Sequence, residues 1–208
     1  AIILSFNIRG HGDSTQDVPG DPKDFWVRGL DDAKDYYYRG AYLDCVRAVD
    51  YLCSREDVNT EQIAVWGGSQ GGGLAFATAA LDARIDLCVA DIPWLCDWKN
   101  YLELAGKNDD EEIKAWLRAK ERRTAEGTLK TLSYFDTMNL AEWIKCPTLM
   151  GVGLQDSICP PSTSFATFNR ITAPRDFRIY EDRGHGLSWD HYQWVISEME
   201  ERFVTQSR

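Results

Sequence analysis

The sequence contains no run of about 18 apolar residues, the length that a membrane-spanning helix requires. Basic residues are fewer than acidic ones: the sequence has 23 Lys and Arg and 33 Asp and Glu, which gives a formal net charge of -10. A chain this acidic repels nucleic-acid backbones and anionic membrane surfaces. We therefore expect neither a nucleic acid nor a membrane among its partners, and small neutral molecules suit it better.

The sequence has few histidines, and its cysteines do not have the spacing of a metal-binding or redox motif. The three histidines, His11, His185 and His191, form no ligand cluster with the cysteines, so we expect neither a metal nor another cofactor. No two cysteines have the C-x-x-C spacing, and several lie within apolar strand or helix patterns. They are typical of buried free thiols in a reducing compartment and not of a disulfide framework. We therefore expect a cytoplasmic protein. The cysteines are Cys45, Cys53, Cys88, Cys96, Cys146 and Cys159.

The sequence does not begin with methionine, and its first residues already lie inside an apolar run. The near-continuous apolar character of residues 2–8 is typical of a strand in the middle of a parallel sheet. We therefore expect the chain to be the C-terminal part of a longer protein. We also expect residues 1–208 to fold poorly alone, because a gap in the sheet would leave backbone groups unpaired.

What is present suffices for one globular domain, since 208 residues with 44% apolar content can bury a substantial core. Apolar strand patterns alternate with helical patterns, which predicts an α/β fold with a mostly parallel sheet covered by helices on both faces. We take residues 1–208 as one domain that lacks its first strands and residues 94–139 as a helical insertion. The expected strands are 2–8, 63–66, 87–91, 148–153 and 177–181, and the expected helices are 42–54, 72–82, 110–125, 161–171 and 192–203.

The most informative segment is the glycine-rich turn after the apolar run 63–66. It contains G-x-S-x-G, which between a strand and a helix is the nucleophile elbow of α/β-hydrolases. Such a serine sits on a sharp, strained turn, so only very small neighbours, here Gly67 and Gly71, fit two residues to either side. The helix N-terminus behind it offers free N–H groups to an oxyanion. A glycine-rich connection before an ordinary helix is the alternative, but the flanking strand and helix favour Ser69 as a nucleophile.

A serine nucleophile needs a base to take its proton and an acid to orient that base. In α/β-hydrolases these follow along the chain in the order serine, acid, histidine, which leaves two histidines after Ser69. His185 lies in a flexible loop directly after the expected strand 177–181, where a base can reach across the strand ends. His191 lies in the aromatic start of the last helix, where packing or capping suits it better. We therefore favour His185 as the base.

Three aspartates compete for the role of the acid. Asp156 follows the expected strand 148–153, at the same edge of the sheet as the serine. Asp91 also ends a strand, but it comes one strand too early for the usual order. Asp182 is too close to His185 in sequence for its carboxylate to approach the ring easily from behind. We therefore favour Asp156.

An oxyanion hole takes one backbone N–H from the residue after the nucleophile, which here is Gln70. The second donor normally comes from a loop after an earlier strand, and that loop would precede residue 1. Pro93 and Trp94 follow the expected strand 87–91 and are candidates for the wall of a small acyl pocket. Ordinary packing explains these two residues equally well.

Longer motifs make the prediction more specific. In chain order they are R-G-H at 9–11, Y-Y-Y-R-G at 36–40, G-G-S-Q-G-G-G at 67–73, T-L-S-Y-F-D at 131–136 and D-S-I-C-P-P-S-T at 156–163. Their order and spacing resemble carbohydrate esterase family 7, the acetyl xylan esterase and cephalosporin-C deacetylase group. The resemblance runs through essentially the whole chain.

This resemblance implies an α/β-hydrolase fold and a serine esterase that needs no cofactor. Its substrates would be short acetylated xylo-oligosaccharides and similar small acetyl esters. It implies Ser69 as nucleophile, His185 as base, Asp156 as orienting acid and the Gln70 N–H as oxyanion donor. It also implies a second donor, a tyrosine N–H, in a segment that this chain does not include. The family's usual assembly implies a homo-oligomer, a hexamer whose active sites face an inner cavity.

Two positions depart from the family pattern. The family's H-E after the last strand is His185-Gly186 here, so a carboxylate near the base is lost. The family's R-G-Q is Arg9-Gly10-His11 here. We expect Arg9 and His11 to brace the loops beneath the site, holding its geometry without taking part in the chemistry.

Two alternatives remain open. A peptidase or a lipase would use the same elbow, and a panel of acyl chain lengths would separate these from an acetyl esterase. A non-catalytic, hydrolase-like fragment or interaction domain is the second alternative, because half of the oxyanion hole is absent from the chain.

Overall fold

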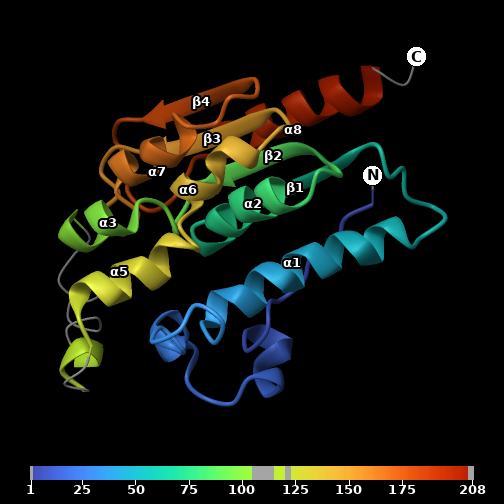
Figure 1. Ribbon diagram of the computed structural model, residues 1–208. Helices are drawn as coiled ribbons and strands as arrows, with labels where there is room; N and C mark the ends of the chain where they lie inside the picture. The colour runs from blue at the N-terminus through green and yellow to red at the C-terminus, as the bar shows by residue number, and fades with distance from the viewer. Residues whose placement is uncertain (1, 105–114, 120–122, 206–208) are drawn as a thin grey trace.

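The computed structural model describes residues 2–104, 115–119 and 123–205 (Figure 1). Its sheet has four parallel strands in the order β1-β2-β3-β4, which is also their order along the chain. Four of the five expected strands are therefore confirmed. Their bounds are Ile63–Gly68 for β1, Ile85–Asp91 for β2, Thr148–Gly153 for β3 and Arg175–Tyr180 for β4.

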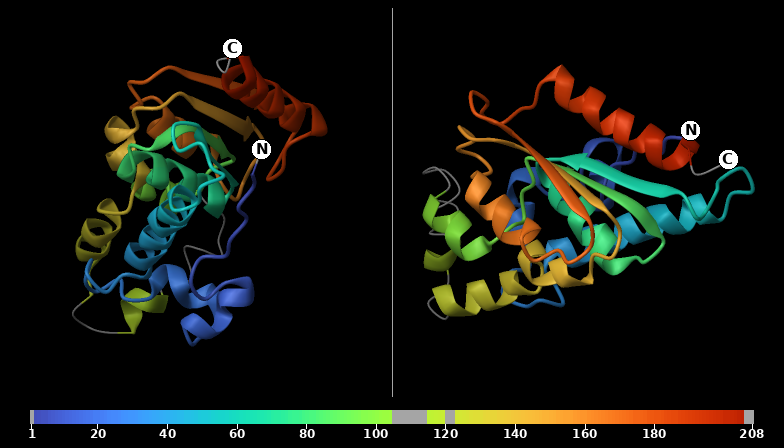
Figure 2. Two further views of the ribbon diagram at one scale, coloured as in Figure 1. Left: turned by 90° about the vertical axis from the view of Figure 1, so that its right-hand side faces the viewer. Right: turned by 90° about the horizontal axis from the view of Figure 1, so that it is seen from above.

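Helices cover both faces of this sheet. Phe76 of α2 and Phe168 of α7 pack on one face in a cluster with Met150 of β3. Leu149, the preceding residue, packs with Trp194 of α8 in a cluster on the other face. Successive strand residues point to opposite faces, so this alternation places α8 opposite α2 and α7, as Figure 2 shows. The predicted α/β class, with a parallel sheet covered on both sides, is confirmed.

The helices agree with expectation in most places. The expected helices 72–82, 161–171 and 192–203 correspond to α2, α7 and α8, while 42–54 corresponds to a longer α1. The α-helices are α1 Tyr37–Cys53, α2 Gln70–Leu81, α3 Trp98–Leu104, α5 Ala125–Ser133, α6 Thr137–Leu140, α7 Pro161–Phe168 and α8 Trp189–Thr205. Short 3₁₀ helices are η1 Gly12–Asp17, η2 Pro22–Val27 and η3 Ala141–Trp143.

Two helix predictions need comment. The helix α1 begins five residues before the expected residue 42, because Tyr37 and Tyr38 are buried there and tertiary packing overrides their modest helix propensity. The helix expected at 110–125 lies largely outside the described residues; residues 115–118 are helical. The boundaries 94–139 of the proposed insertion stay a prediction.

The strand predicted at residues 2–8 is wrong for this structure. These residues are assigned to no strand, and the side chains of Ile2, Ile3 and Phe6 are 49%, 88% and 45% exposed. A strand is held by ladder hydrogen bonds to a neighbour, and within the described residues β1 at the edge of the sheet pairs with β2 alone. Ile8, at the end of this segment, is buried in an aromatic cluster.

This aromatic cluster is a second core, built from helices and loops. It joins η2, α1 and α3 through Trp26, Tyr36, Tyr38 and Trp98, whose rings contact one another or their neighbours. None of the buried residues that the structure places in it belongs to β1–β4. Large aromatic side chains bury much area each, so this cluster fixes α1 against the start of α2.

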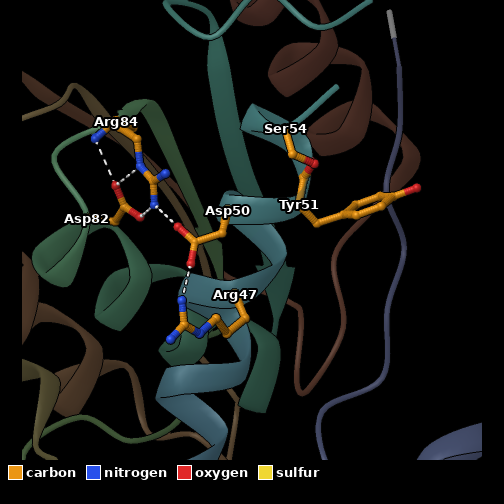
Figure 3. Close-up of polar contacts among 6 residues, drawn as sticks. All are labelled: Arg47, Asp50, Tyr51, Ser54, Asp82 and Arg84. Carbon is orange, nitrogen blue, oxygen red and sulfur yellow. Dashed lines mark hydrogen bonds and ion pairs between the residues drawn. The ribbon is translucent and has the colours of Figure 1, made fainter. Parts of the chain in front are cut away.

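An ion-pair network ties the C-terminal half of α1 to the turn between α2 and β2 (Figure 3). Arg84 Nη2 contacts Asp82 and Asp50, at 2.5 Å and 2.7 Å, and Arg47 also contacts Asp50. Asp82 is buried, so its charge requires this partner.

Across the described residues, no helix combines the length and the apolar character needed to cross a membrane.

Candidate active site

The turn between β1 and α2 has the strained geometry expected of a nucleophile elbow. Ser69 has φ 55° and ψ -119°, a backbone conformation that residues with a side chain rarely adopt. A Cβ on Gly67 would lie 2.3 Å from the Gly71 carbonyl oxygen, so a side chain at Gly67 is excluded. A Cβ on Gly71 itself would meet nothing within 4 Å. The steric requirement therefore acts at Gly67, and Gly71 contributes its closely approaching backbone.

Hydrogen bonds hold the strained serine in place. Its N–H donates to the carbonyl oxygen of Asp91 at the end of β2, at 2.9 Å. Its own carbonyl accepts from the N–H groups of Gly73 and Trp94, at 3.1 Å and 2.9 Å. The serine backbone is thus anchored both to its own helix and to the neighbouring strand.

The structure brings Ser69, His185 and Asp156 together at the carboxyl end of the sheet. The distance from Ser69 Oγ to His185 Nε2 is 2.9 Å, and that from His185 Nδ1 to Asp156 Oδ2 is 2.8 Å. The side chain of His185 is 23% exposed, whereas that of Asp156 is 1% exposed. Such a line can pass the serine proton to the imidazole while the carboxylate orients the ring. The catalytic roles of the three residues stay predictions.

Asp156 is itself held in place by the turn that follows β3. Its Oδ1 accepts from the backbone N–H groups of Ile158 and Cys159, both at 2.9 Å. Because one carboxylate oxygen is committed to the turn, the other is directed at His185. The side chain of Cys159 comes near the nucleophile as well, with Sγ 4.0 Å from Ser69 Oγ. Nothing in the sequence pattern indicated that this thiol would lie beside the serine.

Gln70 occupies the position expected of an oxyanion donor. It is the first residue of α2, so its backbone N–H has no acceptor inside the helix. Its side chain reaches the other way, and Nε2 donates to the Tyr38 hydroxyl at 2.7 Å. Sequence reasoning missed Tyr38, although the tyrosine-rich motif at 36–40 contains it.

The two residues expected in an acyl pocket are closely packed. Pro93 is buried, and a Cβ on Gly72 would lie 3.0 Å from its Cα. The Trp94 ring contacts the rings of Tyr38 and Trp98, among others. Packing therefore accounts for both positions, and a role in an acyl pocket stays a prediction.

Arg9 and His11 lie against α1. The Arg9 guanidinium binds both carboxylate oxygens of Asp44, at 2.8 Å and 2.6 Å. The Tyr37 hydroxyl donates to the Arg9 carbonyl at 2.6 Å and lies 3.1 Å from His11 Nδ1. Within the described residues, the polar contacts of Arg9 and His11 reach α1 and their own loop. These contacts brace the loop of Arg9 and His11 against α1, and a bracing role toward the site itself stays a prediction.

The remaining histidine and aspartate candidates pair with other groups. His191 Nε2 lies 2.6 Å from Asp91 Oδ1, and both side chains are buried. Asp182 is 85% exposed and lies 3.9 Å from Arg183. Asp91 therefore pairs with His191 and not with His185, and Asp182 is exposed to solvent.

None of the six cysteines forms a disulfide, as predicted. Five are buried and Cys53 is half-buried. Burial raises the pKa of Cys45 to about 11, so this thiol stays protonated at neutral pH. Among the described residues, no group of three or more His, Cys, Asp or Glu side chains is placed to hold a metal ion.

Comparisons with known proteins agree with the sequence motifs. The family model for acetyl xylan esterase (AXE1) matches residues 1–198. The acetyl esterase Axe7A of Xylanibacter ruminicola is 41% identical over 174 residues, which cover 84% of this chain and 37% of that protein.

Two solved structures have the same α/β-hydrolase fold. The acetyl xylan esterase from Paenibacillus sp. R4 is 42% identical with a TM-score of 0.85, over 93% of this chain and 63% of that one. Acetyl xylan esterase 1 from Thermoanaerobacterium sp. JW/SL YS485 is 35% identical with a TM-score of 0.84, over 95% of this chain and 65% of that one. The chain thus spans less than two thirds of the length of each of these three relatives.

Proposed function

Because the chain belongs to the acetyl xylan esterase family, we propose that it is a serine esterase acting on small acetyl esters. Acetylated xylo-oligosaccharides and cephalosporin C-like esters are the substrates that its family motifs favour. The observation that carries the proposal is the hydrogen-bonded line from Ser69 through His185 to Asp156, with distances of 2.9 Å and 2.8 Å. The three residues come from three separate loops at one edge of the sheet.

In the first half of the reaction, His185 Nε2 takes the proton of the Ser69 hydroxyl while Oγ bonds to the acetyl carbonyl carbon. Asp156 stabilises the imidazolium that forms. The carbonyl oxygen becomes an oxyanion, and the Gln70 N–H donates to it; one such donor lowers the barrier by about 3–4 kcal/mol. His185 then gives its proton to the departing sugar oxygen as the ester C–O bond breaks. The acetyl group remains on Ser69.

In the second half, water takes the place of the sugar alcohol. His185 removes a proton from the water as its oxygen attacks the acetyl-enzyme carbonyl, and the oxyanion forms again beside Gln70. Collapse of this intermediate breaks the bond to Ser69 Oγ, and His185 returns the proton to that oxygen. Acetate leaves, and the residues regain their starting protonation states. Every proton is accounted for without a metal ion or a cofactor.

We also propose that the protein assembles as a homo-oligomer, a hexamer by its resemblance to carbohydrate esterase family 7. We also propose a cytoplasmic location, which is supported by six cysteines that form no disulfide, because thiols stay reduced in such a compartment.

The proposal is tested by Ser69→Ala in the full-length protein. Hydrolysis of p-nitrophenyl acetate should fall by about 10⁴-fold or more, because nucleophile and base act as a unit. The matched control is Ser133→Ala, which alters an exposed serine at the end of α5 and should keep the wild-type rate. Wild-type turnover by Ser69→Ala would refute the assignment. A panel of acyl chain lengths and peptide amides completes the test, since preference for long chains or amides would favour a lipase or a peptidase.

A further inference from the structure

The tyrosine-rich motif at the start of α1 has a feature that the proposed mechanism does not use. Tyr36, Tyr37 and Tyr38 are consecutive and buried, with exposures of 1%, 5% and 1%. The hydroxyls of Tyr36 and Tyr37 donate to the backbone carbonyls of Trp26 in η2 and of Arg9, respectively. The Tyr38 hydroxyl instead accepts from the side chain of Gln70, at 2.7 Å. This bond joins α1 directly to the residue that follows the nucleophile.

Tyr38 is a rigid anchor. Its ring contacts the rings of Tyr36, Tyr37, Tyr42 and Trp94, which hold it from several sides. Burial raises the pKa of the Tyr38 phenol, and the hydrogen bond from Gln70 lowers that pKa by less. The hydroxyl therefore stays neutral across the working pH range of an esterase, and its acceptor lone pair is fixed in space.

The Tyr38 contact adds a side-chain anchor to the backbone hydrogen bonds that hold the first turn of α2. This turn begins with a strained serine whose side chain makes no capping hydrogen bond to the helix. It then continues through Gly71, Gly72 and Gly73, residues with the greatest backbone freedom. Gln70 is thus the only residue between Ser69 and Leu74 with a side chain that can tether this turn. The peptide plane that carries the Gln70 N–H is held on one side by the two hydrogen bonds that the Ser69 carbonyl accepts, and the Tyr38 contact holds the Gln70 side chain on the other.

We propose that Tyr38 is a positioning residue for the oxyanion donor: its hydroxyl holds the Gln70 side chain and thereby aims the Gln70 backbone N–H. This inference rests on the proposed esterase function. Oxyanion donors act through preorganisation, so a donor that is present but badly aimed stabilises the transition state less. The bound ester has no developed oxyanion charge, so its binding depends less on this aim. Loss of the Tyr38 hydroxyl should therefore lower kcat and leave KM nearly unchanged.

The test compares Tyr38→Phe with Tyr42→Phe in the full-length protein. Both changes remove one buried hydroxyl from α1, but the Tyr42 hydroxyl donates to the carbonyl oxygen of Phe135, whereas the Tyr38 hydroxyl accepts from Gln70. We expect Tyr38→Phe to lower kcat about tenfold, less than the loss of a whole donor, with KM within about twofold. Tyr42→Phe should keep the wild-type kcat even where its thermal stability falls equally.

A second pair of measurements separates aiming from general damage. Methylboronic acid forms a tetrahedral adduct with a catalytic serine, whereas acetate mimics only the product. Tyr38→Phe should weaken inhibition by the boronic acid by the same factor as kcat and leave inhibition by acetate unchanged. Gln70→Met keeps the backbone N–H and removes the tether, so it should reproduce the fall in kcat. The double variant should be no worse than either single variant, because both changes break one interaction.

The outcomes separate the two proposals. Ser69-dependent activity that is unchanged in Tyr38→Phe and Gln70→Met would overturn the positioning role and leave the esterase function standing. Independent, multiplying losses in the double variant would overturn it as well. If Tyr38→Phe does not fold, a wild-type kcat in Gln70→Met decides against the role by itself. Absence of any Ser69-dependent hydrolysis in the wild-type protein would instead refute the proposed function.

Discussion

Two imidazole–carboxylate pairs lie near the carboxyl end of the sheet, and they differ in environment more than in the distance between ring nitrogen and carboxylate oxygen. His185 lies 2.8 Å from Asp156, and His191 lies 2.6 Å from Asp91. The His185 side chain is 23% exposed, and its second ring nitrogen faces the Ser69 hydroxyl. The His191 side chain is fully buried. Pairing with an aspartate therefore does not by itself make a histidine suitable as a catalytic base. The imidazole must also reach the nucleophile and solvent.

The buried pair has its own structural task. The second ring nitrogen of His191 lies 3.2 Å from the Tyr180 hydroxyl, and Trp66 Nε1 donates to the second carboxylate oxygen of Asp91. The carbonyl of Asp91 also accepts the N–H of Ser69. The pair thus joins β1, β2, β4 and α8 beneath the elbow. It holds strand ends together, whereas the proposed role of the His185–Asp156 pair is to move a proton.

Removal of the exposed histidine should have the largest effect on activity. We expect His185→Ala in the full-length protein to reduce kcat/KM for p-nitrophenyl acetate by about 10⁴-fold or more, because the serine loses its base. The free energy of unfolding, measured by urea denaturation, should change little, since this side chain is partly exposed. A variant that kept most of its activity would mean that another group serves as the base.

Removal of the buried histidine should have the opposite profile. His191→Leu leaves the Asp91 carboxylate buried with Trp66 as its remaining side-chain donor, so we expect a loss of about 3–5 kcal/mol in the free energy of unfolding. The kcat of the folded fraction should fall far less than in His185→Ala. The matched variant His191→Gln can still place an N–H toward Asp91 and should recover most of the stability. Equal destabilisation by Leu and Gln would show that the pairing itself contributes little.

The ion pair between Arg84 and Asp82, at the other end of β2, extends the comparison, because its carboxylate is buried while its guanidinium is 39% exposed. The hydrogen bond from Arg84 lowers the pKa of Asp82 below its ordinary value of 3.8. Because Arg84 is 39% exposed and solvent screens its charge, Arg84→Gln should cost about 1 kcal/mol of unfolding free energy at neutral pH, near the upper range of surface pairs. A depressed carboxylate pKa stabilises the fold above the unfolded-state pKa, so the difference between variant and wild type should shrink as the pH falls below about 4.

The control for this last measurement is Arg47→Gln, which alters an arginine with 80% exposure in the same network (Figure 3). We expect no measurable change in stability from it. A penalty for Arg84→Gln that stays constant from pH 7 to the acid limit would contradict a charge-dependent role for Asp82.

Local physical rules made much of the fold predictable. The four strands of the sheet were located to within two residues at each end, because apolar runs between turn signals depend on nearby residues only. The strand predicted at 2–8 was wrong because a strand also needs a neighbour, which no local pattern can supply. The start of α1 was misplaced for a similar reason, since burial of Tyr37 and Tyr38 outweighs propensity.

The site, like the fold, has features that local sequence patterns predict and others that depend on contacts between distant elements. The elbow motif and the order of residues at strand ends predict Ser69, Asp156 and His185. Both features can be recognised in the sequence alone. The Tyr38 contact with Gln70 and the Cys159 approach to Ser69 were not foreseen, because each depends on how separate elements pack. Asp91 and His191 were judged unsuited to the chemistry, but their pairing with each other was not foreseen.

By itself, the sequence determined the elbow, the alternation of strands and helices, and the residue types available at the strand ends. These follow from sterics and periodicity that act within about ten residues. Tertiary structure alone decided which of these groups meet: Ser69 and His185 are 116 positions apart, and Asp91 and His191 are 100 apart. Contacts over such separations arise from the packing of whole elements, so only the folded molecule distinguishes the histidine that faces the serine from the histidine sealed beneath it.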